Sequence, residues 1–253
     1  MPVEIVTVPC LTDNYAYLLH DDVSGQTALV DAPEAAPILA ALDARGWTLT
    51  DILITHHHAD HVDGLAALRG AARVIGATAD AHRLPPLDVA VNPGETLSVI
   101  GQNVQIVDVS GHTIGHVAFY LADSAAAFTA DSLMAMGCGR RFEGLPAMMW
   151  DSLQRLSALP ADTLICSGHE YTASNARFAL TIEPESPDLL ARVAAITAAR
   201  AAGLPTVPSL LSVELATNPF LRAHLPSVKA SMGLPDASDA AVFAEIRGRK
   251  DRF

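Results

Sequence analysis

The chain has 253 residues, half of them hydrophobic, and carries a formal net charge of −12. Charged residues are only 17% of the sequence, which excludes a disordered protein, and the apolar content is sufficient for a packed core. The acidic balance argues against a nucleic-acid partner, because phosphate contact needs a basic face. The apolar runs are short and interrupted by Pro, Gly or charge, so no membrane span is expected.

The N-terminus and the cysteines indicate a cytoplasmic protein. Residues 1–11 have no basic stretch followed by an apolar one, so no signal peptide is expected. Cys10, Cys138 and Cys166 are scattered and odd in number, which fits reduced thiols better than a disulfide framework or a cysteine zinc site. No feature of the sequence sets an oligomeric state, and a monomer is the working expectation.

Up to about residue 170 the sequence alternates strand-like and helix-like segments. Helices are expected at residues 35–45, ending before Gly46, and at 150–159. The expected strands are short, rich in Val, Ile, Leu or aromatic residues, and bounded by Gly, Pro, Asp or Ser; they cover residues 3–8, 16–20, 27–31, 52–55, 73–76, 96–100, 104–109, 117–121, 126–129 and 163–167. This pattern predicts an α/β layered domain.

After about Tyr171 the strand signal fades and helical segments remain, at residues 173–181, 188–202 and 240–247. Ser186 followed by Pro187 offers an N-cap with proline in the first helical position. Ser238 or Asp239 could open the last helix. We therefore expect a catalytic domain over residues 1–170 and a small helical, substrate-binding domain over residues 171–253.

An H-x-H-x-D-H array directly follows the apolar segment at residues 51–54. It places His56, His58, Asp60 and His61 within six residues. Imidazole nitrogens and carboxylate oxygens are the ligands that zinc, iron and manganese accept. Packing in a hydrophobic core does not explain such a cluster, because burying unpaired imidazoles costs free energy. The array predicts a metal site.

Three further candidate ligands also lie just past the end of an expected strand: His112, Asp131 and His169. Strand ends at one edge of a sheet converge, and α/β folds place their chemistry there. The sequence therefore predicts a two-metal centre. His57 is expected to face away from the ligands, and His116 could support a ligand imidazole by a hydrogen bond.

These residues resemble the metallo-β-lactamase superfamily and, within it, the glyoxalase II (hydroxyacylglutathione hydrolase) family. The array alone indicates only the superfamily, whereas later segments narrow the resemblance. The similar segments are DNYAYLL (13–19), GHTIGH (111–116), FTADSL (128–133), CGRRFEG (138–144), GHEYT (168–172), IEPE (182–185), NPFLR (218–222) and RGRKD (247–251).

The resemblance implies an αββα sandwich with a C-terminal helical domain, and two divalent metal ions. Zinc is the first expectation, with iron and manganese as alternatives. One ion would be held by His56, His58 and His112, the other by Asp60, His61 and His169, and Asp131 would bridge them. The glutathione part of a substrate would contact Arg140, Phe142, Tyr171, Arg247 and Lys250. Arginine and lysine pair strongly with carboxylates such as those of glutathione.

The implied reaction is hydrolysis of the thioester of S-(2-hydroxyacyl)glutathione, with S-D-lactoylglutathione as the usual case, by a hydroxide held between the ions. Asp60 and Asp131 would be the catalytic carboxylates. The chain departs from the family pattern at three places, none of them a ligand. Phe142 stands where some members have Tyr, Leu145-Pro146 replaces a more polar pair, and Asp63 replaces a frequent Gly.

The sequence also allows three other functions. A persulfide dioxygenase would use the same fold with a single iron, although the complete second ligand set favours the hydrolase. A hydrolase for another ester, such as a lactone or β-lactam, would not need residues 139–144 or the helical tail. A metal-binding module without activity would keep the ligands and lose turnover.

Overall fold

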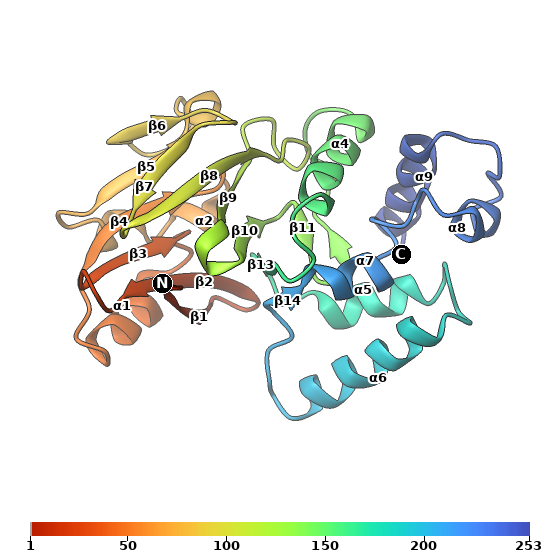
Figure 1. Ribbon diagram of the computed structural model, residues 1–253, viewed down its shortest axis with the longest axis horizontal. Helices are drawn as coiled ribbons and strands as arrows, with labels where there is room; N and C mark the ends of the chain where they lie inside the picture. The colour runs from red at the N-terminus through yellow and green to blue at the C-terminus, as the bar shows by residue number, and fades with distance from the viewer. Residues whose placement is uncertain (1) are drawn as a thin grey trace. The chain divides into compact units, whose positions relative to one another are not determined.

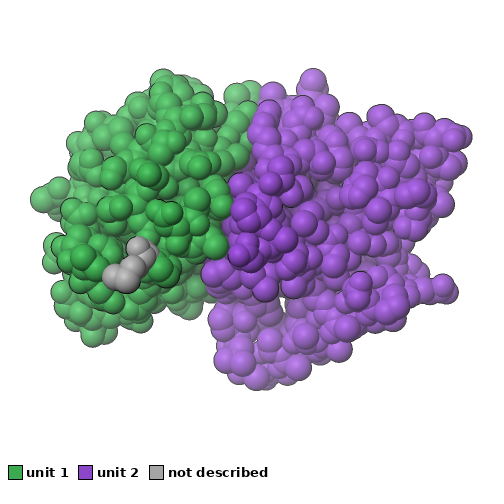
Figure 2. All heavy atoms as spheres, in the orientation of Figure 1, with its two compact units in different colours: residues 1–108, 113–130 green, residues 109–112, 131–253 purple. Residues whose placement is uncertain are grey.

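The computed structural model describes residues 2–253, and the chain divides into two compact units (Figure 2). Unit 1 comprises Met1–Asp108 and Thr113–Ala130, and unit 2 comprises Val109–His112 and Asp131–Phe253. Within residues 2–253, no helix has the length and apolar character needed to cross a membrane.

The first sheet of unit 1 has six strands in the order β1-β2-β3-β4-β5-β6 (Figure 1). Its first three strands pair antiparallel, and β3 to β6 run parallel. The parallel part brings the carboxyl ends of β3 and β4 to the same edge. The strands are β1 (Glu4–Cys10), β2 (Asn14–Asp21), β3 (Gln26–Val30), β4 (Leu49–Ile54), β5 (Arg73–Ala77) and β6 (Val89–Val91).

The part of the second sheet that belongs to unit 1 has four antiparallel strands, in the order β10-β9-β8-β7. The ring of Tyr17 on β2 meets the ring of Phe128 on β10 edge-on at 5.4 Å between centroids. Both strands are buried along almost their whole length, so the two sheets pack face to face. The strands are β7 (Thr96–Val99), β8 (Gln102–Asp108), β9 (Val117–Leu121) and β10 (Ala126–Ala130).

Helices cover the other face of the first sheet. Side chains alternate between faces along a strand, so Leu18 lies opposite to Tyr17 and joins a cluster with Ile38 and Leu65. This gives unit 1 a helix–sheet–sheet layering. Its helices are α1 (Ala35–Asp43), α2 (Ala59–Val62) and α3 (Leu65–Leu68), with short 3-10 turns at Thr78–Asp80 and Ala122–Ser124.

Unit 2 is mainly helical. The predicted N-caps are confirmed: the hydroxyl of Ser186 accepts from the amide of Leu189, and that of Ser238 accepts from the amide of Ala241. Its strands are β11 (Leu133–Met134), β12 (Gly137–Cys138), β13 (Leu164–Ser167) and β14 (Ser209–Leu210). Its helices are α4 (Pro146–Ser157), α5 (Thr172–Ala179), α6 (Pro187–Ala201), α7 (Leu211–Thr217), α8 (Pro226–Ser231) and α9 (Asp239–Asp251).

The predicted strands and helices are confirmed with shifts at their ends. The largest shifts are in α9, which ends at Asp251 and not at Arg247, and in α4, which begins at Pro146 and not at Trp150, because proline is well suited to the first helical turn. The elements β6, β11, β12, β14, α3, α7 and α8 were not predicted. They are short, and α3, α7 and α8 have no side-chain cap that would mark their start.

Candidate metal centre

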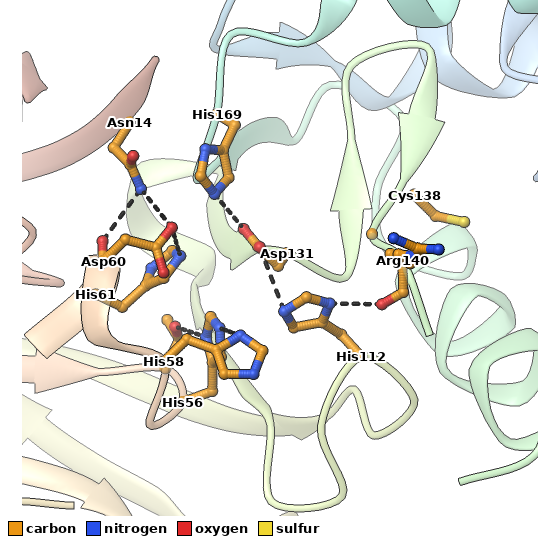
Figure 3. Close-up of polar contacts among 12 residues, drawn as sticks. Asn14, His56, His58, Asp60, His61, His112, Asp131, Cys138, Arg140 and His169 are labelled. Atoms are coloured by element: carbon orange, nitrogen blue, oxygen red, sulfur yellow. Dashed lines mark hydrogen bonds and ion pairs between the residues drawn. The ribbon is translucent and has the colours of Figure 1, made fainter. Parts of the chain in front are cut away.

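The H-x-H-x-D-H array forms the connection between β4 and α2 in unit 1. His56 is fully buried, and its Nε2 lies 3.2 Å from Nδ1 of His58. Two ring nitrogens at this distance need a shared proton or a cation close by. Asp60 is half-buried, and its carboxylate accepts a hydrogen bond of 3.0 Å from the amide of Asn14 (Figure 3).

A buried carboxylate beneath the array orients two of its imidazoles. Asp31 follows β3, next to β4, and its Oδ2 lies 2.8 Å from Nδ1 of His61. A carboxylate only accepts, so Nδ1 of His61 donates and its Nε2 is left as the ligand atom. Thr55 donates its hydroxyl to Asp31 and so accepts from Nδ1 of His56 at 3.0 Å. His56 is thereby held in the same tautomer, with Nε2 as its ligand atom.

Replacing Asp31 by asparagine is expected to weaken metal binding about 10- to 100-fold. Asparagine has one acceptor oxygen, whereas Asp31 accepts from Thr55 N, Thr55 Oγ1 and His61 Nδ1. Metal affinity would be measured by chelator competition. The matched control is Asp51→Asn, another buried aspartate at the sheet, which pairs with Arg73. Equal affinity in both variants would contradict the role of Asp31.

The other histidines of this region have different partners. His57 is bonded through Nδ1 to Oδ2 of Asp80 at 2.9 Å, and Asp80 also pairs with Arg83. The His116 ring is buried, with its centroid 4.6 Å from that of His56. His57 therefore anchors the array from outside, and His116 packs against a predicted ligand.

In unit 2 the remaining predicted ligands surround one carboxylate. His112 Nε2 lies 3.4 Å from Oδ2 of Asp131, and His169 Nε2 lies 3.3 Å from Oδ1 (Figure 3). His112 Nδ1 faces the carbonyl oxygen of Arg140 at 2.6 Å, so Nδ1 donates and Nε2 is the ligand atom. Asp131 thus presents one oxygen to each imidazole, as a bridging carboxylate would.

The donor set suits a metal centre. All three of these residues are buried, as are His56 and His61, and burial of such groups is costly unless they are paired or bound to a cation. Among residues 2–253, three groups of histidine and aspartate side chains could each hold a metal ion. Together these groups contain the seven predicted ligands, His56, His58, Asp60, His61, His112, Asp131 and His169. Their nitrogen and oxygen donors fit zinc, iron and manganese.

Two predicted substrate contacts lie beside the ligands of unit 2. The exposed ring of Tyr171 stacks on His169, with centroids 4.6 Å apart. Phe142 is 61% exposed and meets the His112 ring edge-on at 5.3 Å. Large exposed aromatic rings against buried imidazoles are well placed to contact a substrate.

The predicted basic contacts differ in exposure. Arg247 is buried, and its guanidinium donates to the carbonyl oxygen of Cys138 at 2.9 Å and pairs with Asp251 at 3.0 Å. Arg140 is exposed, with Nε 3.9 Å from the same Asp251 carboxylate. Arg247 therefore holds the backbone around Cys138, whereas Arg140 is open to solvent.

Lys250 lies on α9 and is half-buried against α5. Its ammonium lies over the rings of Phe178 and Phe253, at 5.4 and 5.2 Å from their centroids. Burial, together with the charges of Arg247 and Arg177, lowers the pKa of Lys250 from 10.5 to about 8. The ammonium would thus gain from an anionic partner.

The cysteines have no place in this chemistry. All three are buried free thiols. Burial raises the pKa of Cys10 and of Cys138 to about 11, and raises that of Cys166 as well. They are therefore protonated at neutral pH, and the free thiols agree with the expectation of reduced cysteines.

Sequence reasoning missed Asn14, Asp31 and Asp80, which orient the ligands or the array. Asp31 could have been found, because it ends the predicted strand at residues 27–31, close to where the predicted ligands lie relative to their strands. Asn14 and Asp80 carry no such signal, since their contacts with Asp60 and His57 join distant parts of the chain.

Comparison with known proteins gives matches over almost the whole chain. Residues 12–169 match the family described as "Metallo-beta-lactamase superfamily", and residues 170–253 match "Hydroxyacylglutathione hydrolase C-terminus". The chain is 65% identical to a hydroxyacylglutathione hydrolase of Cereibacter sphaeroides and 64% identical to one of Ruegeria pomeroyi, each with all of both chains covered. A solved structure of TTHA1623 in a di-iron-bound form is 27% identical with a TM-score of 0.61, covering 86% of this chain and all of the other. These matches confirm the predicted fold class.

Proposed function

Because this chain belongs to the hydroxyacylglutathione hydrolase family of the metallo-β-lactamase superfamily, we propose that it hydrolyses S-(2-hydroxyacyl)glutathione. S-D-lactoylglutathione would give glutathione and D-lactate. The observation that carries this proposal is full-length identity of 65% to a relative of that name. The persulfide dioxygenase, other-ester and inactive-module alternatives have no comparable support.

We propose that the seven donors bind two divalent ions. His56, His58 and His112 would hold one ion, Asp60, His61 and His169 the other, and Asp131 would bridge them. The tautomers set by Asp31 and by the Arg140 carbonyl support this division, because they leave Nε2 of His56, His61 and His112 as ligand atoms. Zinc is the first candidate, and iron is supported by the di-iron relative.

When bound, the two ions would supply a nucleophile from water at neutral pH and a Lewis acid for the thioester carbonyl. The chain's own residues hold the geometry of that reaction. Asn14 fixes the Asp60 carboxylate, which would orient the attacking water. Asp131 would set the spacing of the ions through its two oxygens. The leaving thiol needs little help with protonation, because thiols are much more acidic than alcohols.

The glutathione part of the substrate would contact Arg140, Phe142, Tyr171, Arg247 and Lys250. Their positions support this: Tyr171 and Phe142 lie against predicted ligands, and the Lys250 ammonium is half-buried over two aromatic rings, where an anionic partner would stabilise its charge. A local basic patch on a chain of net charge −12 would attract an anionic ligand. Residues 171–253 would accordingly form the substrate-binding domain and residues 1–170 the catalytic one.

The direct test is hydrolysis of S-D-lactoylglutathione, followed at the thioester absorbance, with elemental analysis of the same sample. We expect turnover together with about two ions per chain. Oxygen uptake with glutathione persulfide would instead favour the dioxygenase, and turnover only on lactones or β-lactams would favour another ester hydrolase. Bound metal without turnover on any of these substrates would favour the inactive module. We still expect the protein to be cytoplasmic in the cell and monomeric in solution.

Lys250 gives this function a predicted pH dependence. With its pKa near 8, its charge is present below that pH and lost above it, so the KM for the anionic substrate should rise as pH increases through about 8. The same shift affects stability. The unfolded chain binds this proton more tightly, so Lys250 opposes folding below about pH 8, and this cost disappears as pH rises from about 8 toward 10.5.

The variant Lys250→Gln should raise KM about tenfold at pH 7, the loss of one charge-assisted contact, while kcat changes little, because this contact is remote from the reacting carbonyl. The variant should also lack the rise of KM near pH 8. A matched control is Lys229→Gln, since Lys229 pairs with Asp239 in another part of unit 2. An unchanged KM profile in Lys250→Gln would remove Lys250 from the substrate site.

A further inference from the structure

The hairpin of β11 and β12 lies directly between two parts of the proposed site, since it follows Asp131 and precedes Arg140. Its turn is buried: Ala135 is 2% exposed and Met136 is fully buried. Met136 also adopts a positive φ of 60°, which is uncommon for a residue with a side chain. Buried backbone groups in such a turn need hydrogen-bond partners, and three side chains supply them.

Asn218 binds both strands of the hairpin where they enter the turn. Its amide nitrogen donates to the carbonyl oxygens of Met134 and Gly137, at 3.1 and 3.0 Å. The same nitrogen lies 3.1 Å from Oε2 of Glu214. Asn218 is fully buried and follows α7 directly, so this helix end is fixed to both strands of the hairpin.

Glu214 binds the tip of the turn. Its Oε2 accepts from the amide of Met136 at 2.9 Å, and its Oε1 accepts from Ser209 at 2.6 Å and from the guanidinium of Arg192. The side chain is fully buried. A buried carboxylate is tolerated only with such complete pairing, which fixes the Met136 amide in one place.

Asn175 holds the turn from α5. Its amide nitrogen donates to the carbonyl oxygen of Ala135 at 3.1 Å. A Cβ on Gly137 would come within 2.4 Å of the same amide nitrogen, so the turn and the side chain are in close contact. The turn is thus bound by side chains from two separate helical segments.

The hairpin in turn fixes two predicted ligands. Its return strand leads into Gly139, whose amide donates to the carbonyl oxygen of Ser132 at 3.1 Å. A Cβ on Gly139 would lie 1.8 Å from the carbonyl oxygen of Asp131. The next carbonyl, of Arg140, holds Nδ1 of His112 at 2.6 Å. The position of the hairpin therefore determines where Asp131 and His112 stand.

We propose that Asn175, Glu214 and Asn218 are positioning residues of the metal centre: they bind the β11–β12 turn, and the hairpin orients Asp131 and His112. This inference rests on the proposed ligand assignment. Hydrophobic contacts could stabilise the hairpin as well, but directional hydrogen bonds to both strands and to the tip fix one arrangement of it. The helical part of unit 2 then contributes to metal binding as well as to substrate contact.

The test compares Asn218→Ala and Asn175→Ala with the control Thr163→Val. Thr163 is a buried residue of unit 2 whose hydroxyl makes no hydrogen bond within residues 2–253, so valine removes no contact with the turn or with Glu214. Each protein is stripped of metal and titrated with Co²⁺, whose visible absorption reports ligand geometry. Thermal unfolding of each sample gives the folded fraction to which the titration is normalised.

We expect Co²⁺ to bind about tenfold more weakly to Asn218→Ala and to Asn175→Ala, with an altered absorption spectrum, whereas Thr163→Val keeps the wild-type affinity and spectrum. A folded Asn175→Ala or Asn218→Ala with the wild-type spectrum and affinity would overturn the proposal, as would an equal loss in Thr163→Val. If Asn218→Ala does not fold, Asn175→Ala alone decides the outcome. Wild-type protein that binds Co²⁺ but hydrolyses no thioester with any metal would refute the proposed function and leave this comparison intact.

Discussion

Replacement of Asp131 by asparagine is expected to lower hydrolysis of S-D-lactoylglutathione by on the order of 10³-fold, which corresponds to about 4 kcal/mol of transition-state stabilisation. The carboxylate lies between two imidazoles, with one oxygen 3.4 Å from His112 and the other 3.3 Å from His169. Asparagine keeps the shape but loses the negative charge and one acceptor, so it can no longer bridge two cations. Steady-state kinetics and metal content of the same preparation measure the effect.

The Asp131→Asn variant should lose both metal and kcat. Bound metal should fall below two ions per chain, and the remaining activity should not recover with excess substrate, because the defect is in kcat. Asp51→Asn serves as the control, since Asp51 is also a buried aspartate and its partner is Arg73. If Asp131→Asn keeps near-full turnover, the two-metal mechanism is wrong.

Local chemistry made much of the fold and the site predictable. Strands of continuous aliphatic and aromatic residues, such as β9, and helices with a serine cap, such as α6 and α9, are marked in the sequence by properties that also stabilise them. The candidate ligands could be predicted for a similar reason, because they follow strand ends and because packing does not explain so many imidazoles and carboxylates close together.

The contacts that orient these ligands could not be predicted in the same way. Glu214 reaches Met136 across 78 positions and Asn218 reaches Met134 across 84, and nothing near either residue in the sequence indicates such a partner. A buried polar residue looks like any surface Glu or Asn until the fold places it. Long-range hydrogen bonds of this type therefore required the structure.

Gly139 lies against Asp131 and His112, and its replacement by alanine is expected to damage the site more than alanine at any other glycine described here. The added Cβ would lie 1.8 Å from the carbonyl oxygen of Asp131 and 3.1 Å from Nδ1 of His112. Neither neighbour is the end of a flexible chain that could move aside, so the backbone on one side must shift. A displacement of about 1 Å at a catalytic group can cost on the order of 10²-fold in rate, and overpacking of this kind costs about 1–3 kcal/mol of stability.

The comparison with Gly248→Ala separates the site from general intolerance of side chains at glycine. Gly248 lies within α9, where a Cβ would meet only the end of Arg252 at 3.5 Å. Alanine there should stabilise the helix by about 0.5–1 kcal/mol, so thermal unfolding of the two variants should shift in opposite directions. Metal content and kcat should fall only in Gly139→Ala. Wild-type metal content in that variant would show that the backbone of Asp131 can move without loss of the ions, and the hairpin would then not be what fixes the carboxylate.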